Sequence, residues 1–149
     1  LDTFQSFVRP IQHPHLTEFC STLTGIQQSD IETAKVFFDI APALSQFIRQ
    51  YATTSSTWAS WGEYDKKQFE RDSLRHGIQN PLHLEHVNLK KIFSKKHKKA
   101  AGRQVGVLRA LHLADLSFTG RLHRGLDDAI NIAKLLPWTV GDAKLSTEV

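Results

Sequence analysis

The first third of the chain alternates short apolar runs with turn and capping signals. Thr3–Val8 is β-prone and partly alternating, and Pro10 stops it, which predicts a short strand. Leu16–Leu23 predicts a short helix, because Thr17 can cap its N-terminus and Gly25 can end it. The pattern therefore predicts a strand followed by a helix.

Two more helices are predicted to follow. Ser29 and Glu32 have the spacing of a capping box, and their helix would run to about Phe38. Pro42 fits the first turn of the next helix. The apolar face of that helix would consist of Leu44, Phe47, Ile48 and Tyr51.

The rest of the chain predicts one short strand among helices. Thr57–Trp61 is the best candidate for a buried strand, and Glu63–His76 is a polar, helix-favouring stretch that Gly77 closes. Further helices are predicted at Asn88–Phe93, Gln104–Leu113 and Leu126–Leu136, the last stopped by Pro137, and irregular segments at Pro81–Val87 and Leu116–Gly120. The sum is a helix-rich α/β or α+β pattern with few strands for its length.

Length and composition are those of one globular domain. The 149 residues can bury a single core, and a hydrophobic content of 40% with 23% charged residues is ordinary for a folded protein. Glycine and proline are scattered, so we expect one domain over residues 1–149. Cys20 is the only cysteine, which excludes an internal disulfide. The apolar runs are short and no signal pattern is present, so we expect a cytoplasmic protein without a membrane partner.

Positive charge is concentrated in one window. The formal net charge is +4, and the sequence pI is near 9.3. Between Asn88 and Arg103 no acid occurs, and the basic residues are Lys90, Lys91, Lys95, Lys96, Lys98, Lys99 and Arg103. A phosphate backbone suits such a field, through charge pairing and counterion release. A solvated, lysine-rich surface is the alternative interpretation.

Two residues near the C-terminus have the chemistry of a hydrolytic site. With Gly125 between them, His123 can lie on a loop while Asp128 occupies the first turn of a helix, so that both side chains converge. A carboxylate there can hold Mg²⁺ or Mn²⁺, and a neutral histidine can accept a proton from water. First-turn acids are also favoured by the helix dipole, so a purely structural interpretation stays open for this pair.

Two other segments could bind ligands. Asp65 follows the predicted strand Thr57–Trp61, and the mouth of a sheet is a common place for a metal ligand; helix capping is the alternative. Phe19–Ile26 is an apolar segment on which a nucleobase could pack, although core packing is the default explanation. The spacings that could bind zinc, which no cysteine or acid completes, are those of His13 with His15 and His83 with His86.

Four motifs in this order resemble those of a known family. They are Phe19-Cys20 with Leu23-Thr24-Gly25-Ile26, Ser60-Trp61-Gly-x-Tyr-Asp65, Asn88-Leu-Lys90, and Gly120-x-x-His123-x-Gly125-x-Asp127-Asp128-Ala-x-Asn131. In order and spacing they are similar to the DEDDh exonucleases, and in particular to the branch of histone-mRNA 3′ exonuclease and prion-interacting protein within the RNase T and DnaQ-like group. The resemblance runs from about Phe4 to Leu136.

The resemblance implies roles for individual residues. Asp65 and Asp128 match metal ligands of the family, and His123 matches its general base. Leu23, Thr24 and Ile26 match the segment that packs around the terminal nucleotide. Lys90 matches a recurrent lysine whose role is either substrate binding or structural. The implied fold is an RNase H-like α/β fold, a mixed sheet flanked by helices. The implied reaction is phosphodiester hydrolysis with two Mg²⁺ or Mn²⁺ ions, which releases a 5′-mononucleotide from the 3′ end of RNA or single-stranded DNA.

One motif of the family is missing. Its first strand carries an Asp-x-Glu pair that supplies two further metal ligands, and no Asp-x-Glu occurs in this chain. We expect the pair upstream of Thr3–Val8, and Leu1 and the absence of methionine agree with an N-terminally incomplete domain that lacks the first one or two strands. The chain itself is then expected to have little or no nuclease activity.

Three functional hypotheses follow. The first is a 3′–5′ exonuclease. The alternative is a non-catalytic nucleic-acid-binding module that has kept the exonuclease fold without the acid pair. A third, a basic protein–protein adaptor, is supported only by the lysine-rich window between Asn88 and Arg103.

Overall fold

The structure is a computed structural model that describes residues 2–102 and 105–146, with Lys99 described by its backbone alone. Contacts divide the chain into two compact units. Unit 1 consists of Leu1–Thr57 and Lys66–Glu85, and unit 2 consists of Trp58–Asp65 and His86–Val149.

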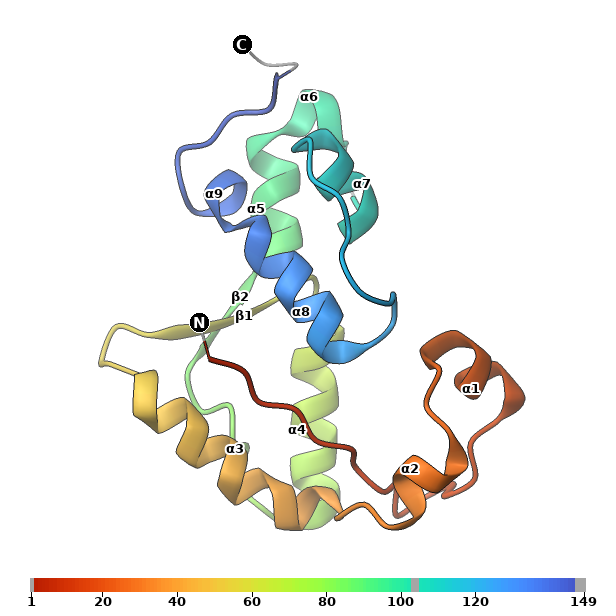
Figure 1. Ribbon diagram of the computed structural model, residues 1–149. Helices are drawn as coiled ribbons and strands as arrows, with labels where there is room; N and C mark the ends of the chain where they lie inside the picture. Colours follow the sequence, from red (N-terminus) through yellow and green to blue (C-terminus); the bar gives the residue numbers. More distant parts are fainter. Residues whose placement is uncertain (1, 103–104, 147–149) are drawn as a thin grey trace. The chain divides into compact units, whose positions relative to one another are not determined.

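Helices dominate the described part of unit 1 (Figure 1). They are α1 (Glu18–Thr24), α2 (Gln28–Glu32), α3 (Phe37–Tyr51) and most of α4 (Tyr64–His76). The predicted caps of α1 are confirmed, because Thr17 Oγ1 accepts a hydrogen bond from the Cys20 N–H and Gly25 ends the helix at φ 67°. Gly77, at φ 62°, follows α4 as predicted.

Three predictions for unit 1 are wrong. Thr3–Val8 forms no strand in the described residues, and the described sheet consists of two other segments. Strand propensity alone makes no strand without ladder hydrogen bonds to a partner. The capping box of α2 is formed by Gln27 and Asp30. The helix ends at Glu32 and does not reach Phe38. α3 does not begin at Pro42, which lies inside it.

Packing explains the early start of α3. Phe37, Ile40 and Ala41 are its buried residues, and they lie on the N-terminal side of the exposed Pro42. The Phe37 ring centroid is 6.0 Å from that of Phe69 and 5.8 Å from that of His76, both on α4. Burial of these residues favours a helix start on the N-terminal side of Pro42 and offsets the hydrogen bond that the proline cannot donate. Of the apolar face predicted from sequence, Leu44, Phe47 and Ile48 are half-buried and Tyr51 is exposed.

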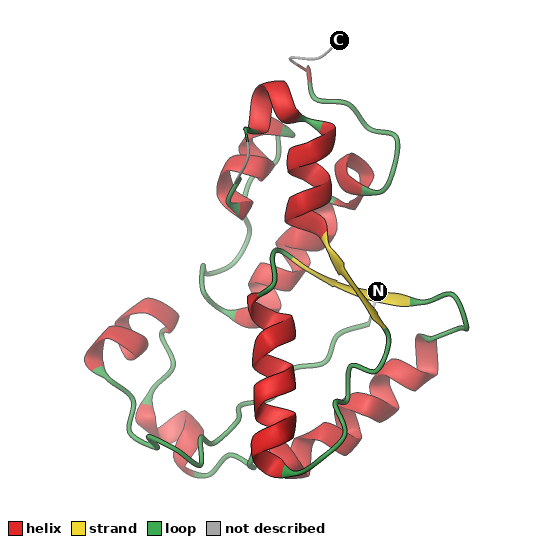
Figure 2. Cartoon of the chain, turned by 180° about the vertical axis from the view of Figure 1, so that it is seen from behind, coloured by secondary structure: helices red, strands yellow, loops and turns green. Residues whose placement is uncertain are grey.

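The described sheet contains two paired strands, β1 (Thr57–Ser60) and β2 (Glu85–Asn88) (Figure 2). β1 is the strand predicted at Thr57–Trp61. β2 overlaps the stretch Pro81–Val87, which was predicted to be irregular. The strand itself contains one apolar residue, Val87, so its sequence gives little strand signal. α4 follows β1 and precedes β2, and a helix between two neighbouring strands is the connection typical of a parallel βαβ unit.

Short helices make up most of unit 2 (Figure 1). They are α5 (Leu89–Lys96), α6 (Lys98–Ala101), α7 (Val107–Leu113), α8 (Gly125–Lys134) and α9 (Leu136–Thr139). α5 packs against α6 and α9, and α7 packs against α6 and α8. The buried cluster between them consists of Phe93, Ala101, Val105, Ala110, Leu111, Ala114, Leu135 and Leu145.

Two helix ends in unit 2 test the sequence prediction. Asn88 Oδ1 accepts the Lys91 N–H at 3.0 Å, so α5 begins where the sequence predicted a helix. Pro137 does not stop α8 directly, because α8 ends at Lys134 and the proline lies in the first turn of α9, where a missing N–H costs little. α7 begins at Val107, and Gln104, the predicted start, lies outside the described residues.

No helix in the described residues combines the length and the apolar character that crossing a membrane requires.

Candidate active site

His123 and Asp128 are placed around the start of α8, as the sequence predicted. His123 is on the preceding loop with a left-handed φ of 63°, and Asp128 is in the first turn of the helix. The backbone N–H of His123 donates a hydrogen bond to the Asp128 carboxylate. This bond holds the backbone of His123 next to the Asp128 carboxylate. The His123 side chain is exposed.

Asp65 comes close to this pair. It lies in the first turn of α4, where it is exposed, and it belongs to unit 2 with His123 and Asp128. Burial raises the pKa of Asp128, and the charges of Asp127 and Asp65 raise it further, whereas the hydrogen bond and the charge of His123 lower it. Asp128 is thus within electrostatic range of both His123 and Asp65. Their roles remain predictions.

Asn131 joins the loop before α8 to the helix; it ends the last sequence motif, but no role was predicted for it. Asn131 is buried; its Oδ1 accepts the Thr119 N–H at 3.0 Å, and its Nδ2 donates to the Thr119 and Asp127 carbonyls at 2.7 Å each. Lys134 Nζ also donates to Asn131 Oδ1, at 2.9 Å. A polar residue on the inner face of an amphipathic helix was the available signal for this role.

Asp127 holds the same loop at a second point. Its Oδ2 accepts the Arg121 N–H at 2.9 Å. Its carboxylate also lies against Gly120, where a Cβ would come within 2.5 Å of the Asp127 Cγ and where φ is +90°. Gly120 is therefore required both by its backbone conformation and by the close approach of Asp127. Together, Asn131 and Asp127 determine the path of the loop that ends at His123.

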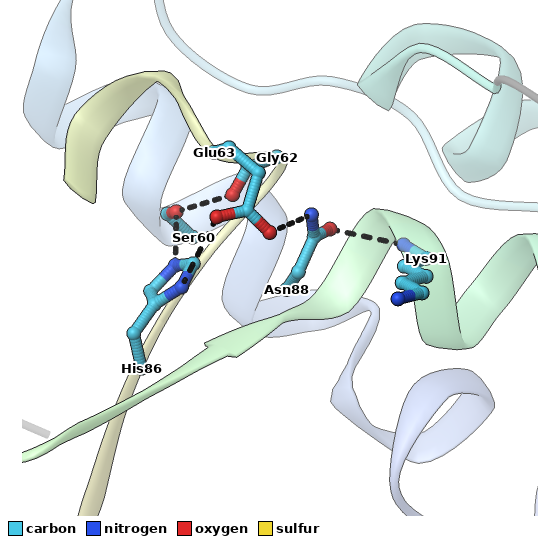
Figure 3. A network of polar contacts seen from close by, with 6 residues as sticks. All are labelled: Ser60, Gly62, Glu63, His86, Asn88 and Lys91. Carbon is cyan, nitrogen blue, oxygen red and sulfur yellow. Dashed lines mark hydrogen bonds and ion pairs between the residues drawn. The ribbon is translucent and has the colours of Figure 1, made fainter. Parts of the chain in front are cut away.

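A second polar network fixes the turn that leads into Asp65 (Figure 3). Ser60 Oγ donates to the Gly62 carbonyl at 3.1 Å and lies 2.9 Å from Nε2 of His86. The His86 side chain is only 5% exposed, and its ring centroid is 4.4 Å from that of Trp58. These contacts tie β1 to β2 just before α4 begins.

Glu63 continues this network towards α5 (Figure 3). Its Oε1 accepts from Asn88 Nδ2 at 2.8 Å, and its Oε2 lies 3.9 Å from Nδ1 of His86. Asn88 in turn caps α5 through the Lys91 N–H. The starts of α4 and α5, which carry Asp65 and Lys90, are thus linked through side chains. His86 has a structural partner in Ser60, and no cluster of the kind that its spacing from His83 suggested is present among the described residues.

The remaining predicted substrate positions are divided between the units. Leu23, Thr24 and Ile26, around the C-terminus of α1, belong to unit 1. Leu23 is exposed, and Thr24 Oγ1 donates to the Cys20 carbonyl at 2.8 Å and accepts the Ile26 N–H at 3.1 Å. Lys90 is half-buried in the first turn of α5 in unit 2.

Asp65 and Asp128 are donors of the right kind for a divalent cation. Their carboxylate oxygens are the ligands that Mg²⁺ and Mn²⁺ prefer. A cation would offset the burial, and the smaller repulsion by Asp127 and Asp65, that raise the pKa of Asp128. No group of three His, Cys, Asp or Glu in the described residues is arranged to hold a metal ion. The two carboxylates therefore supply part of a coordination shell.

Comparison with known proteins places the chain in a family. Residues 1–136 match the RNase_T family, described as exonuclease. The 3′-5′ exonuclease eri1 of Schizosaccharomyces pombe is 27% identical over 166 residues, which cover 91% of this chain and 54% of that protein. ERI1 exoribonuclease 2 of Homo sapiens is 31% identical, over 91% of this chain and 22% of that protein. The chain thus spans about half or less of the length of these relatives.

The fold agrees with this match. The nuclease domain of 3′hExo, a DEDDh family member in complex with rAMP, superposes with a TM-score of 0.84 at 25% identity, covering 95% of this chain and 73% of that one. The predicted RNase H-like α/β class is confirmed, although in the described residues the sheet consists of β1 and β2. The chain belongs to the RNase T exonuclease family and has the fold of its DEDDh members.

Proposed function

We propose that this chain forms most of a 3′–5′ exonuclease domain that shortens RNA, or single-stranded DNA, from its 3′ end. The observation that carries the proposal is the gathering of Asp65, His123 and Asp128 in unit 2. The names of similar proteins include exoribonuclease, which favours RNA. The family match spans both units, which supports one exonuclease domain built from the two.

In the proposed reaction, Asp65 and Asp128 hold the cofactor and His123 acts as general base. Two Mg²⁺ or Mn²⁺ ions, when bound, supply activation of the attacking water and neutralisation of charge on the phosphate. His123, exposed at the loop, accepts the proton of that water. The water oxygen attacks phosphorus, and the bond between phosphorus and the 3′ oxygen of the preceding nucleotide breaks. The products are a 5′-mononucleotide and a shortened strand whose new 3′ oxygen takes up a proton.

In unit 1, the proposed substrate contacts lie around the end of α1. Leu23 is exposed beside the end of α1 and offers an apolar surface for a base. Thr24 and Ile26 shape the turn at Gly25 that presents this surface. Lys90, at the start of α5, is assigned to the substrate phosphates.

We further propose that the 149-residue chain hydrolyses nucleic acid poorly by itself. Its sequence has no Asp-x-Glu pair, and two carboxylates offer a pair of cations few ligands. The non-catalytic binding module is the second candidate function, and the missing acid pair is the observation that favours it.

A 3′-labelled oligonucleotide assay tests the proposal. The chain would be compared with a chimera in which a family strand carrying Asp-x-Glu precedes Leu1. We expect the chimera, with Mg²⁺ or Mn²⁺, to release 5′-mononucleotides, and the chain alone to release few. His123→Ala in the chimera should lower the rate about 10²- to 10⁴-fold, the usual contribution of a positioned general base.

His112→Ala is the matched control, because His112 is an exposed histidine on α7 in the same unit. Its activity should equal that of the unsubstituted chimera. Mn²⁺-induced broadening of the Asp65 and Asp128 NMR signals in the chain alone gives a readout that does not depend on activity, and Asp128→Asn should abolish it. An oligonucleotide that stays intact under every condition, but is bound, would favour the binding module.

A further inference from the structure

A groove of about 720 Å³ lies on unit 2 beside the start of α5. Its lining includes Lys90, Lys91, Lys95 and Lys98, together with Ser94 and Glu63. The volume is within the usual range of ligand sites. The groove is therefore large enough for more than a single side chain or ion.

Helical spacing brings Lys91 and Lys95 to one side of α5, and Lys90 and Lys98 line the same groove. Lys91 and Lys95 are four residues apart on α5, and Lys98 follows in α6, so their side chains point towards the same groove. Lys96 points elsewhere, because its Nζ donates to the Gly141 carbonyl. The basic window predicted from sequence is thus divided between a structural lysine and a groove. Arg103 and the side chain of Lys99 lie outside the described residues.

Charge in this groove is predominantly positive. None of its four lysines forms an ion pair with any residue that the structure describes. The carboxylate in the lining, Glu63, accepts a hydrogen bond from Asn88 and lies beside His86. Ser94 Oγ is buried between the lysines without a hydrogen-bond partner among the described residues. A ligand with several negative charges would satisfy these groups.

The groove lining comes within two residues of Asp65 along the chain. Gly62 and Glu63 form part of its lining, and Asp65 follows two residues later at the start of α4. From Lys90 to Lys95, α5 extends about 7.5 Å at 1.5 Å per residue, and Lys98 follows on α6. At about 3.4 Å per nucleotide of a stacked strand, the α5 part corresponds to two or three phosphates, and Lys98 can contact a further one.

We propose that this groove binds the phosphodiester backbone of a single-stranded substrate on the 5′ side of its terminal nucleotide. The inference rests on the proposed exonuclease function, since it takes the strand to end at Asp65. It adds a second contact region, which sets how tightly a strand of several nucleotides is held. Lysines contact phosphates without reading bases, so binding should depend on salt and length and little on sequence.

Binding to the chain itself is measured first, by fluorescence anisotropy with labelled oligo(U) and oligo(dT) of three and twelve nucleotides. Four phosphate contacts predict a slope of log K against log salt of about −3, because each contributes about −0.7 on a single strand. Lys95→Gln/Lys98→Gln should reduce the slope to about −1.4 and weaken binding of the longer strand about 25-fold at about 0.1 M salt.

Arg109→Gln/Lys144→Gln is the matched control. Both residues are exposed in unit 2 and outside the groove lining, so this variant removes the same charge. It should weaken binding less than about twofold, the effect of net charge alone. Equal losses in the two variants would overturn the proposal, as would tighter binding to anionic lipid vesicles than to either oligonucleotide. Equal binding of oligo(U) and oligo(dT) supports backbone recognition, and tighter binding of oligo(U) supports it with added 2′-hydroxyl contacts.

The active chimera separates this proposal from the proposed function. With a dinucleotide substrate, Lys95→Gln/Lys98→Gln should leave the rate unchanged, because a dinucleotide does not reach these lysines. With the twelve-nucleotide strand, KM should rise at least about tenfold at unchanged kcat, in line with the loss of phosphate contacts. If the chimera is active and the two lysine substitutions do not change its KM for the longer strand, the groove does not bind the substrate backbone. The proposed exonuclease function would be unaffected. If the chimera is inactive, the binding measurements still decide about the groove.

Discussion

The two units differ in how completely they bury their side chains. The large side chains that are fully buried are all in unit 2, among the described residues: Phe93, His97, Val105, Leu111, Asn131, Leu135 and Leu145. In unit 1 the buried apolar residues are Ile31, Phe37, Ile40 and Ala41, and none of them is fully enclosed. Phe19 in unit 1 is 71% exposed. The charged candidate residues thus rest on the better-packed unit.

This difference suits the chemistry assigned to each unit. A general base and metal-binding carboxylates act only within a narrow geometry, which a packed support can maintain. Asp128 and His123 are fixed by α8, whose Asn131 is part of the buried interior. The segment around Leu23, which is assigned to an apolar contact with a base, needs less precise positioning and lies in the less enclosed unit.

The comparison predicts its largest effect for matched leucine truncations. Leu111 in unit 2 is 1% exposed, whereas Leu74 in unit 1 is 83% exposed. Leu111→Ala should lower the free energy of unfolding by about 3 kcal/mol, and Leu74→Ala by less than about 0.5 kcal/mol. Urea unfolding followed by tryptophan fluorescence reports on unit 2, because Trp58, Trp61 and Trp138 all belong to it.

Ile40→Ala shows whether the units unfold separately. Ile40 is buried in unit 1. If the substitution shifts the tryptophan transition as much as it shifts the loss of helix seen by circular dichroism, the units unfold together. A small effect of Leu111→Ala would contradict the difference in packing itself.

A smaller effect is expected at two glycines with positive φ. Gly120 in unit 2 lies against the Asp127 carboxylate, whereas a Cβ on Gly77 in unit 1 would meet nothing within 4 Å. Gly77→Ala should cost about 1 kcal/mol, from backbone strain alone. Gly120→Ala should cost about 2–3 kcal/mol, because the same strain is combined with displacement of Asp127. Chemical denaturation measures both.

A double-mutant cycle isolates the clash. In the Gly120→Ala background, Asp127→Ala should be less harmful than it is alone, since the carboxylate has already been displaced. Strict additivity of the two substitutions would mean that Asp127 does not account for the glycine.

Local signals in the sequence predicted the residues that depend on local geometry. Thr17 and Gly25 bound α1, Asn88 caps α5, and His123 and Asp128 flank the start of α8 because capping and helical periodicity involve neighbouring residues. No local pattern showed that Asp65 would approach Asp128. The motif resemblance implied a shared metal site, and the fold had to bring the two carboxylates together.

The errors have a common cause in tertiary packing. Thr3–Val8 has strand propensity without a partner strand in the described sheet, and Phe37 extends α3 past Pro42 because its ring is buried. Asn131 could be placed on α8, but its partner Thr119 lies twelve residues away on a loop of irregular conformation. Such a contact depends on the path of the loop, which no periodic pattern specifies.

The smallest predicted effect concerns two first-turn acids in different environments. Asp39 is exposed at the start of α3 in unit 1, and Asp128 is half-buried at the start of α8 in unit 2. Burial raises the pKa of Asp128, so the folded chain holds that proton more tightly than the unfolded chain does. Stability from this group is fully present below the unfolded carboxyl pKa and is lost as pH rises through the raised folded pKa.

Metal-free Asp128→Asn should therefore be more stable than the unsubstituted chain at pH 7, by less than about 1 kcal/mol because Asp128 is partly solvated. The gain should vanish below about pH 4, where the carboxyl is protonated in both states. Asp39→Asn should have the opposite sign at pH 7 and cost about 0.3–1 kcal/mol, because it removes an exposed charge that favours the helix dipole. Thermal unfolding in EDTA across this pH range measures both. Loss of stability in both variants at pH 7 would mean that the hydrogen bond and charge of His123 outweigh burial at Asp128, and that the site does not strain the fold when metal-free.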